Sequence, residues 1–510
     1  MASQDEIFTG RVEKATYHEP AVPSHRGNPL IEALPPILAD EGEVTIALSN
    51  NVKFDKELLK ASPRVRLHEV DLLRQFWMPD REHLVLEGRI STMIRSGYRN
   101  RNPSDVEKWY AMLGRARENL ETTLNSDGRR RPGGMPSVRD IVQAHATGLS
   151  IEGLSGVGKT TSVKRILSLY PQVIEHEDDS RRMATTKQLV WLMITCPGDG
   201  GVVGLARAIL RAFDVVLETN HLDDYTRKRA SAETMRAAAV SLAHLHALGI
   251  LVIDEIQILH RSKSDNVEGI MNFLLTLMND LRVPVVVVGT AGAAKFLSGE
   301  MQTGRRFSGA GHFPMRPLRR EGELEVFVSR IWGRSLLREN PKWADLSPTR
   351  KQAFVEAFWL MTAGVHDLVM KGFLFAQYHA LERGLETLTP QVFQEVYERD
   401  FKTLHGILGM MHGNRLVDDI EWDEIRKSFA AEGAPGTGTL IGPPPLMAQG
   451  TAEPTSSAPA KRVKKRKPSP PHRKPKEDSE AEIEARMTLL QETGILGAPV
   501  TGAGGDFKGG

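Results

Sequence analysis

The chain has 510 residues, of which 40% are hydrophobic, and this is enough for two or three domains with a sizeable buried core. Its 66 basic and 64 acidic residues leave a net charge of +2, which excludes a global attraction to nucleic acid and allows only a local one. A single cysteine, Cys196, excludes an internal disulfide, and no apolar run approaches the roughly 20 residues needed to cross a bilayer, so we expect a soluble protein of the reducing cytoplasm with no membrane partner.

The first region, residues 1–145, is expected to be helical and to bind partners. Its opening is rich in proline and charge, and the dipeptide Asn28–Pro29 predicts a turn or an extended segment that interrupts any helix. A helical pattern then follows over residues 87–97. The apolar face predicted for that helix consists of Ile90, Met93 and Ile94.

The second region, residues 146–320, alternates short apolar strands with helices, which predicts an α/β core with a parallel sheet covered on both faces. The first strand enters a glycine-rich loop, and the apolar spacing after the loop predicts a helix over 161–169. Strand, loop and helix follow in the order that a phosphate-binding loop requires. The predicted strands are 148–152, 190–195, 250–253 and 285–290.

The loop has the spacing G-x-x-x-x-G-K-T, in which backbone N–H groups turn toward phosphate oxygens. Lys159 is expected to reach the β and γ phosphates of ATP, and the hydroxyl of Thr160 to ligate Mg²⁺. The N-terminus of the following helix adds its partial positive charge to the same anion. The residues predicted to bind the nucleotide are Gly153, Ser155, Gly156, Val157, Gly158, Lys159, Thr160 and Thr161.

Two carboxylates, Asp254 and Glu255, follow the strand 250–253. Asp254 is placed to hold Mg²⁺, and Glu255 is the candidate general base for the attacking water. The alternative is a pair of solvated carboxylates at a strand end. Thr290, at the tip of the next strand, is a candidate to hydrogen-bond that water or the γ phosphate, unless it merely caps its strand. With the upstream loop, these residues predict an NTPase.

Arg305 and Arg306 open a glycine-rich stretch downstream of this site. We expect these guanidinium groups to lie away from the nucleotide of their own subunit. In an assembly one of them could reach the γ phosphate of a neighbouring subunit as an arginine finger. The alternative is an ordinary pair of surface arginines.

A helical region, residues 321–412, and a flexible basic tail, residues 413–510, complete the chain. Ser347–Pro348 and Thr389–Pro390 predict helix starts, because a capping hydroxyl precedes a proline at the first helical position. In the tail, lysines and arginines cluster over residues 461–467. This cluster is either a solvated linker or a mobile arm for phosphate groups or an acidic partner.

This order of motifs resembles the AAA+ ATPases, and within them the TnsC and TniB group of transposition regulators. The resemblance spans residues 28 to about 405. The segments that carry the closer likeness are Asn28–Pro36, Ile90–Tyr98, Arg101–Pro103 and Leu251–Leu259, which includes Asp254-Glu255-Ile256-Gln257. Generic phosphate-loop enzymes lack these segments.

The resemblance implies an AAA+ P-loop ATPase fold with a small helical lid, and a protein that takes ATP and Mg²⁺. Proteins similar to this one form homo-oligomeric rings or helical filaments around duplex DNA and link a target-selector protein to transposase subunits. Hydrolysis, assigned here to Glu255, then controls disassembly. DNA contacts in this class come from pore loops, which nominates Arg261 and Lys263, although a solvated loop is the alternative for both.

One position departs from the family pattern. Many AAA+ lids have Gly-x-x-Arg near the nucleotide, whereas Gly364-Val365-His366-Asp367 has aspartate in place of the arginine. Either Lys371 substitutes one turn later, or no lid cation contacts ATP. Rival hypotheses for the function are a helicase loader or signalling NTPase with a protein partner, and an ATP-binding scaffold that does not hydrolyse.

Overall fold

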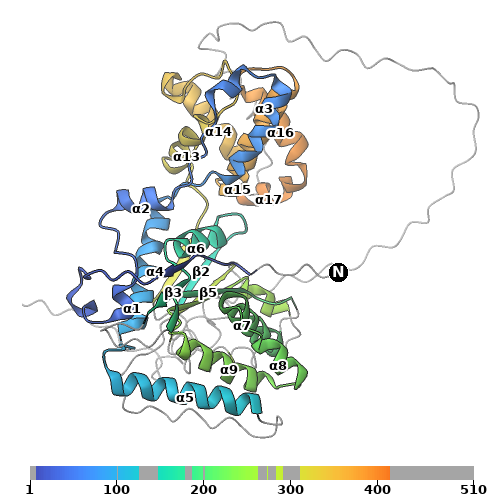
Figure 1. Ribbon diagram of the computed structural model, residues 1–510. Coiled ribbons are helices and arrows are strands. Elements are labelled where there is room, and N and C mark those ends of the chain that lie inside the picture. Colours follow the sequence, from blue (N-terminus) through green and yellow to red (C-terminus); the bar gives the residue numbers. More distant parts are fainter. Residues whose placement is uncertain are drawn as a thin grey trace, which may run out of the picture. The chain divides into compact units, whose positions relative to one another are not determined.

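The computed structural model describes residues 7–99, 101–125, 148–177, 186–198, 201–261, 273, 283–290 and 310–413. It contains a five-stranded parallel sheet with strand order β5-β6-β7-β2-β8. Strands β2 and β5 of this sheet are labelled in Figure 1. The four predicted strands are confirmed, and β8 is an additional edge strand. Their bounds are β2 (Gly148–Gly153), β5 (Trp191–Thr195), β6 (Ile250–Asp254), β7 (Val285–Gly289) and β8 (His312–Met315).

Alternate side chains of the central strands enter two different hydrophobic clusters. In β6, Leu251 and Ile253 belong to one cluster, while Ile250 and Val252 belong to the other. The valines of β7 divide between the same two clusters. Because successive side chains of a strand point to opposite faces, both faces of the sheet are buried, as a parallel sheet requires.

Helices cover each of these faces. On one face lie α7 (Val202–Leu217) and α9 (Ala232–Leu245), with α5 (Val106–Asn125) packed against α9 and α8 (His221–Arg227) against α7. On the other face lie α4 (Arg81–Arg99) and α6 (Lys159–Ser168). The helix predicted at 87–97 is the middle of α4, and Ile90, Met93 and Ile94 are buried as predicted.

A second, small sheet joins the N-terminal segment to the core. It consists of β1 (Val12–Lys14), β3 (Val173–His176) and β4 (Thr186–Leu189). The first two strands pair in parallel, and the last two pair antiparallel. This sheet was not predicted, because β1 is only three residues long and all three are exposed.

The prediction of a turn or extended segment at Asn28–Pro29 is confirmed for Asn28, whose backbone is extended, and is wrong for Pro29, which is helical. These residues begin the short helix α1 (Pro29–Glu32), in which the Asn28 side chain accepts a hydrogen bond from the backbone N–H of Leu30. Asparagine is a favoured N-cap, and proline fits the first helical position because that N–H needs no partner. Other short helices are η1 (Pro23–His25), α2 (Glu41–Leu48), η2 (Lys56–Lys60), α3 (Pro63–Val70), η3 (Asp71–Gln75) and η4 (Ile256–Arg261).

The region after β8 is helical and has its own aromatic core. The hydroxyls of Ser347 and Thr389 cap α14 and α16, which confirms both predicted helix starts. No single helix among the described residues is long and apolar enough to cross a membrane, although α14 and α15, bent by 116° at the break between them, pass that test as a pair. The helices are α13 (Glu323–Trp332), η6 (Trp343–Asp345), α14 (Pro348–Thr362), α15 (His366–Glu382), α16 (Pro390–Asp400), η7 (Lys402–Leu404) and α17 (His405–Met411).

The N-terminal region contributes to both cores. Val70, Leu73 and Phe76, from α3 and η3, belong to the hydrophobic cluster of the helical region, whereas α4 packs on the central sheet. The residues between η3 and α4 thus connect the helical region to the region of the central sheet. The predicted tail lies outside the described residues from position 414 onward.

Arg66 of α3 is fully buried and fastens this helix to the helical region. Its guanidinium donates to both carboxylate oxygens of Glu386 and to the carbonyls of Ala61 and Leu336. The Glu386 side chain is 17% exposed. A bidentate arginine pair of this kind fixes orientation as well as distance.

Replacing Arg66 by methionine is expected to lower the free energy of unfolding by about 3 kcal/mol, because Glu386 and the Leu336 carbonyl lose their donor in a buried place. Urea denaturation followed by tryptophan fluorescence measures the change, since Trp332, Trp343 and Trp359 lie in the same region. Lys60→Met is the control, because its pair with Glu57 is exposed and should contribute less than about 0.5 kcal/mol. Equal effects of the two substitutions would contradict the assignment.

The hydrogen bond from Arg66 lowers the pKa of the Glu386 carboxyl. A depressed folded-state pKa stabilises the protein above the ordinary value of 4.5, and this contribution disappears as the pH falls through the lower folded-state value. The stability difference between wild type and Arg66→Met should therefore narrow in acid.

Gly364 lies in a turn that only glycine fits. Its φ is +75°, and a Cβ there would lie 2.1 Å from the Leu318 carbonyl oxygen. Leu318 donates its N–H to the carbonyl of Gly364 at 2.8 Å, which joins the end of the core to the turn between α14 and α15.

Gly364→Ala is expected to lower the melting temperature well beyond Gly384→Ala. Both glycines have left-handed φ values, so both substitutions cost about 1 kcal/mol of backbone strain. Only at Gly364 must the backbone also shift, because Gly384 has nothing within 4 Å of the added Cβ. Thermal unfolding of both variants is the measurement, and similar melting temperatures would refute the steric argument.

Candidate functional site

The glycine-rich loop connects β2 to α6, and its glycines are required for two different physical reasons. A Cβ on Gly153 would lie 2.5 Å from the carbonyl oxygen of Met315 in the neighbouring strand. Gly156 and Gly158 have φ values of +85° and +94°, which side-chain-bearing residues rarely adopt. Val157 is fully buried between them and anchors the loop in the core. The loop is therefore held in one shape.

Lys159, at the start of α6, is folded back onto this loop. Its Nζ donates to the carbonyls of Gly153 at 2.9 Å and Leu154 at 2.8 Å. Burial lowers the pKa of Lys159, while the nearby Glu255 and Asp254 carboxylates oppose that shift. The ammonium group thus lies between the loop and the two predicted carboxylates.

Thr160 and Asp254, which were both predicted to bind Mg²⁺, are in direct contact. The Thr160 hydroxyl donates to Asp254 Oδ2 at 2.8 Å, and Asp254 is only 4% exposed. A hydroxyl and a carboxylate oxygen side by side are the hard ligands that Mg²⁺ prefers, with phosphate and water oxygens completing its shell. These two residues therefore fit a Mg²⁺ site. Ser155, in the loop, and Thr161, in the first turn of α6, are exposed.

Glu255 follows Asp254 with an unusual backbone. Its φ is +56°, in the left-handed region, and its N–H donates to Asp254 Oδ1 at 2.8 Å. Its carboxylate Oε2 accepts a hydrogen bond from the side-chain amide of Gln257. Gln257 Oε1 in turn accepts the backbone N–H of Thr290 at 3.1 Å. The two carboxylates and the tip of β7 are thus connected at one edge of the sheet.

The helical region reaches the loop through the first turn of α15. The backbone N–H of Asp367 donates to the carbonyl of Gly156 at 3.1 Å, and Val365 lies beside the same glycine. Lys371, the candidate lid cation, pairs with Asp367 Oδ2 at 2.6 Å. The helical region therefore presents an aspartate–lysine pair next to the glycine-rich loop.

Two histidines and Asp80 join the starts of α4 and α15. His83 Nδ1 lies 2.6 Å from Asp80 Oδ1, and His366 Nε2 lies 3.5 Å from Asp80 Oδ2. Burial alone would raise the pKa of the Asp80 carboxyl, but the imidazoles of His366 and His83 together hold it well below its usual range. This cluster is next to Asp367 in the chain, and so it fixes the helix start that contacts the loop.

Several predicted residues are not tested by the structure. Lys263, Arg305 and Arg306 lie outside the described residues. Arg261 ends η4, and its side chain also lies outside them. Conversely, sequence reasoning did not assign Gln257 to the site. Its signal was its position two residues after the candidate base, on the same strand exit.

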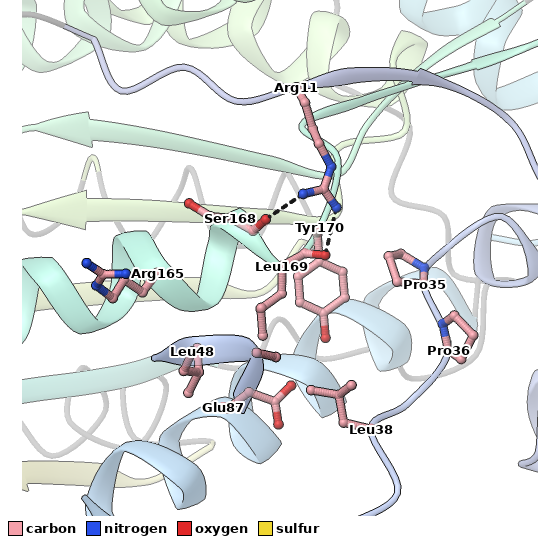
Figure 2. A pocket seen from close by; sticks show the side chains of 11 residues that line it. Arg11, Pro35, Pro36, Leu38, Leu48, Glu87, Arg165, Ser168, Leu169 and Tyr170 are labelled. Atoms are coloured by element: carbon pink, nitrogen blue, oxygen red, sulfur yellow. Dashed lines mark hydrogen bonds between the residues drawn. The ribbon is translucent and has the colours of Figure 1, made fainter. Parts of the chain in front are cut away.

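A separate cavity of about 420 Å³ lies at the far end of α6 (Figure 2). Arg11 closes one side by donating to the carbonyls of Ser168 and Leu169. The hydroxyl of Tyr170 lies beside the carboxylate of Glu87, whose pKa is raised by burial. Because α6 begins at the glycine-rich loop and ends at Ser168, this cavity is distinct from the glycine-rich loop.

The match to a protein family agrees with the glycine-rich loop and the parallel sheet described above. Residues 142–297 match the model of the AAA domain. No curated protein sequence matches the chain. Among solved structures, the chain is similar to the Aeropyrum pernix ORC2 protein in its ADPNP–ADP complexes, with 14% identity, a TM-score of 0.36 and coverage of 57% of this chain and 67% of that one.

Two further solved structures are similar at the same low level. The Walker-type ATPase PABY2304 of Pyrococcus abyssi has 16% identity and a TM-score of 0.34, over 64% of this chain and 83% of that one. The RuvB Holliday junction branch migration motor of Thermotoga maritima has 14% identity and a TM-score of 0.28, over 56% and 67%. On the family match over residues 142–297 and the strand order, the protein has the fold of an AAA P-loop ATPase.

Proposed function

We propose that this protein binds ATP with Mg²⁺, hydrolyses it to ADP and phosphate, and uses that cycle to regulate transposition on duplex DNA. The observation that carries the ATPase part is the contact between Thr160 and Asp254, with Lys159 and Glu255 at the same sheet edge. The part that concerns transposition rests on the resemblance to the TnsC and TniB group.

In this proposal each residue has a distinct task. Lys159 leaves the loop carbonyls and binds the β and γ phosphates, and the loop N–H groups bind phosphate oxygens. Thr160 and Asp254 hold Mg²⁺, which supplies neutralisation of phosphate charge when bound. Glu255 takes a proton from the water whose oxygen attacks the γ phosphorus, while the bond between that phosphorus and the bridging oxygen of ADP breaks. Thr290 orients the water or the γ phosphate.

We further propose that ATP is bound between subunits of a ring or filament on DNA. Arg305 or Arg306 would stabilise the γ phosphate of the neighbouring subunit. Arg261 and Lys263, after the Asp-Glu strand, would contact the DNA backbone. Assembly would then mark the insertion site for the target selector and the transposase, and hydrolysis would dissolve the assembly. Electron microscopy with an ATP analogue and duplex DNA tests the assembly directly.

Lys159→Ala is expected to abolish nucleotide binding and assembly on DNA, because it removes the charge that meets the phosphates. Glu255→Gln should keep nucleotide binding but hold the protein in the assembled state, because the base is lost. Equilibrium binding of a fluorescent ATP analogue and DNA-stimulated phosphate release measure the two effects.

Lys164→Ala is the matched control, since Lys164 lies on the same helix and contacts the ring of Phe8. Normal turnover by Glu255→Gln would show that another group is the base. Turnover that DNA does not stimulate would instead favour a switch that acts on a protein partner.

For the arginines, mixing of subunits gives the test. A protein carrying Arg305→Ala and Arg306→Ala is expected to regain hydrolysis when mixed with Lys159→Ala subunits, which supply the arginine but bind no ATP. The readout is phosphate release as a function of the mixing ratio. A mixture no more active than its two components would favour a structural role for both arginines.

A further inference from the structure

The side-chain amide of Gln257 is hydrogen-bonded at both ends. Its Nε2 donates to Oε2 of Glu255, and its Oε1 accepts the backbone N–H of Thr290 at 3.1 Å. Gln257 lies in η4, which follows β6, whose last residue is Asp254, with Glu255 between the two elements. One side chain thus bridges two strand ends that are 33 residues apart in the sequence.

This bridge fixes a carboxylate that its own backbone does not fix. Glu255 has three side-chain torsions, and its own backbone is left-handed, with a φ of +56°, so it does not continue the strand. Donation by Gln257 engages Oε2 and leaves Oε1 to accept a proton. A general base needs this kind of preset geometry, because small displacements reduce the rate strongly.

We propose that Gln257 is a positioning residue for ATP hydrolysis, which aims the Glu255 carboxylate and connects it to the tip of β7. This inference rests on the proposed ATPase function. Because the contact at β7 is to the backbone N–H of Thr290, a change of nucleotide state at that tip reaches Glu255 through the amide of Gln257. The amide of Gln257 donates one of these hydrogen bonds and accepts the other, so a side chain that only donates or only accepts cannot form both.

A purely structural role is the competing explanation, in which Gln257 merely anchors η4 to β7. Two variants separate the roles. Gln257→Glu keeps an acceptor for the Thr290 N–H but cannot donate to Glu255, and it places a second negative charge beside that carboxylate. Gln257→Met has similar size and can form neither hydrogen bond.

Both variants are expected to lose roughly ten- to a hundredfold in kcat, less than the roughly hundred- to ten-thousandfold contribution of a general base because Glu255 itself is kept, with ATP affinity within about twofold of wild type. Amide hydrogen exchange at Thr290, measured on the full chain without nucleotide, gives a readout other than activity. Exchange should accelerate in Gln257→Met, because the acceptor is lost, and stay slow in Gln257→Glu. Gln391→Met is the matched control, because Gln391 is an exposed glutamine that also donates to a glutamate, Glu395.

Normal kcat in Gln257→Glu would overturn the proposal, because donation to Glu255 would then be dispensable and the bridge would be an anchor. Parallel losses of kcat and ATP affinity would overturn it in the same way. The two proposals fail separately: if wild type releases no phosphate from ATP, the proposed function fails. If wild type is active, Glu255→Gln is inactive and Gln257→Met matches wild type, only the positioning role fails.

Discussion

The hydrogen bond between Thr160 and Asp254 depends on the parallel direction of the strands, and it joins the helix after the glycine-rich loop to the end of β6. The loop follows β2 and the carboxylates follow β6, but β7 lies between these strands. The two motifs can meet because all three strands are parallel and end at the same edge of the sheet. There Thr160, at the start of α6, reaches Asp254 at the end of β6. A parallel sheet must be buried on both faces, and the alternation of Ile250, Leu251, Val252 and Ile253 between two clusters meets that demand. The chemistry at the edge therefore requires helices on both faces.

The loop is also connected to the helical region. The backbone of Asp367 binds Gly156, the turn before it is fixed by Gly364 against Leu318, and His366 meets Asp80. These contacts hold the first turn of α15 between the glycine-rich loop and the start of α4. A change in the shape of the glycine-rich loop would therefore displace the first turn of α15. Because α15 shares a hydrophobic core with α3 and η3, the N-terminal segment would move as well. This connection is made by direct contacts between segments that are far apart in the sequence.

Local signals in the sequence were sufficient for much of the fold. The four strands, the loop, the helix after it and the caps at Ser347 and Thr389 each depend on residues within a few positions of one another. The meeting of Thr160 and Asp254 was also predictable, since parallel strands end at one edge. Contacts set by tertiary packing were not: the pairing of the three-residue β1 and the approach of Asp367 to Gly156 have no local pattern. At Asn28–Pro29 one dipeptide fits both a turn and a helix start, and the side-chain cap decided between them.

Lys159 shows why the site favours an anion over water. In the described arrangement its ammonium group is bound by two neutral carbonyls of its own loop, and burial already works against its charge. A phosphate would exchange neutral acceptors for a charged one, and charge-assisted hydrogen bonds are about twice as strong. The carbonyls of Gly153 and Leu154 lose their donor in that exchange. Because Leu154 is 46% exposed, water can donate to them instead. The carboxylates of Asp254 and Glu255 oppose an uncompensated anion at the same place. Phosphate binding without a cation would therefore be weakened by the residues that make Mg²⁺ binding favourable.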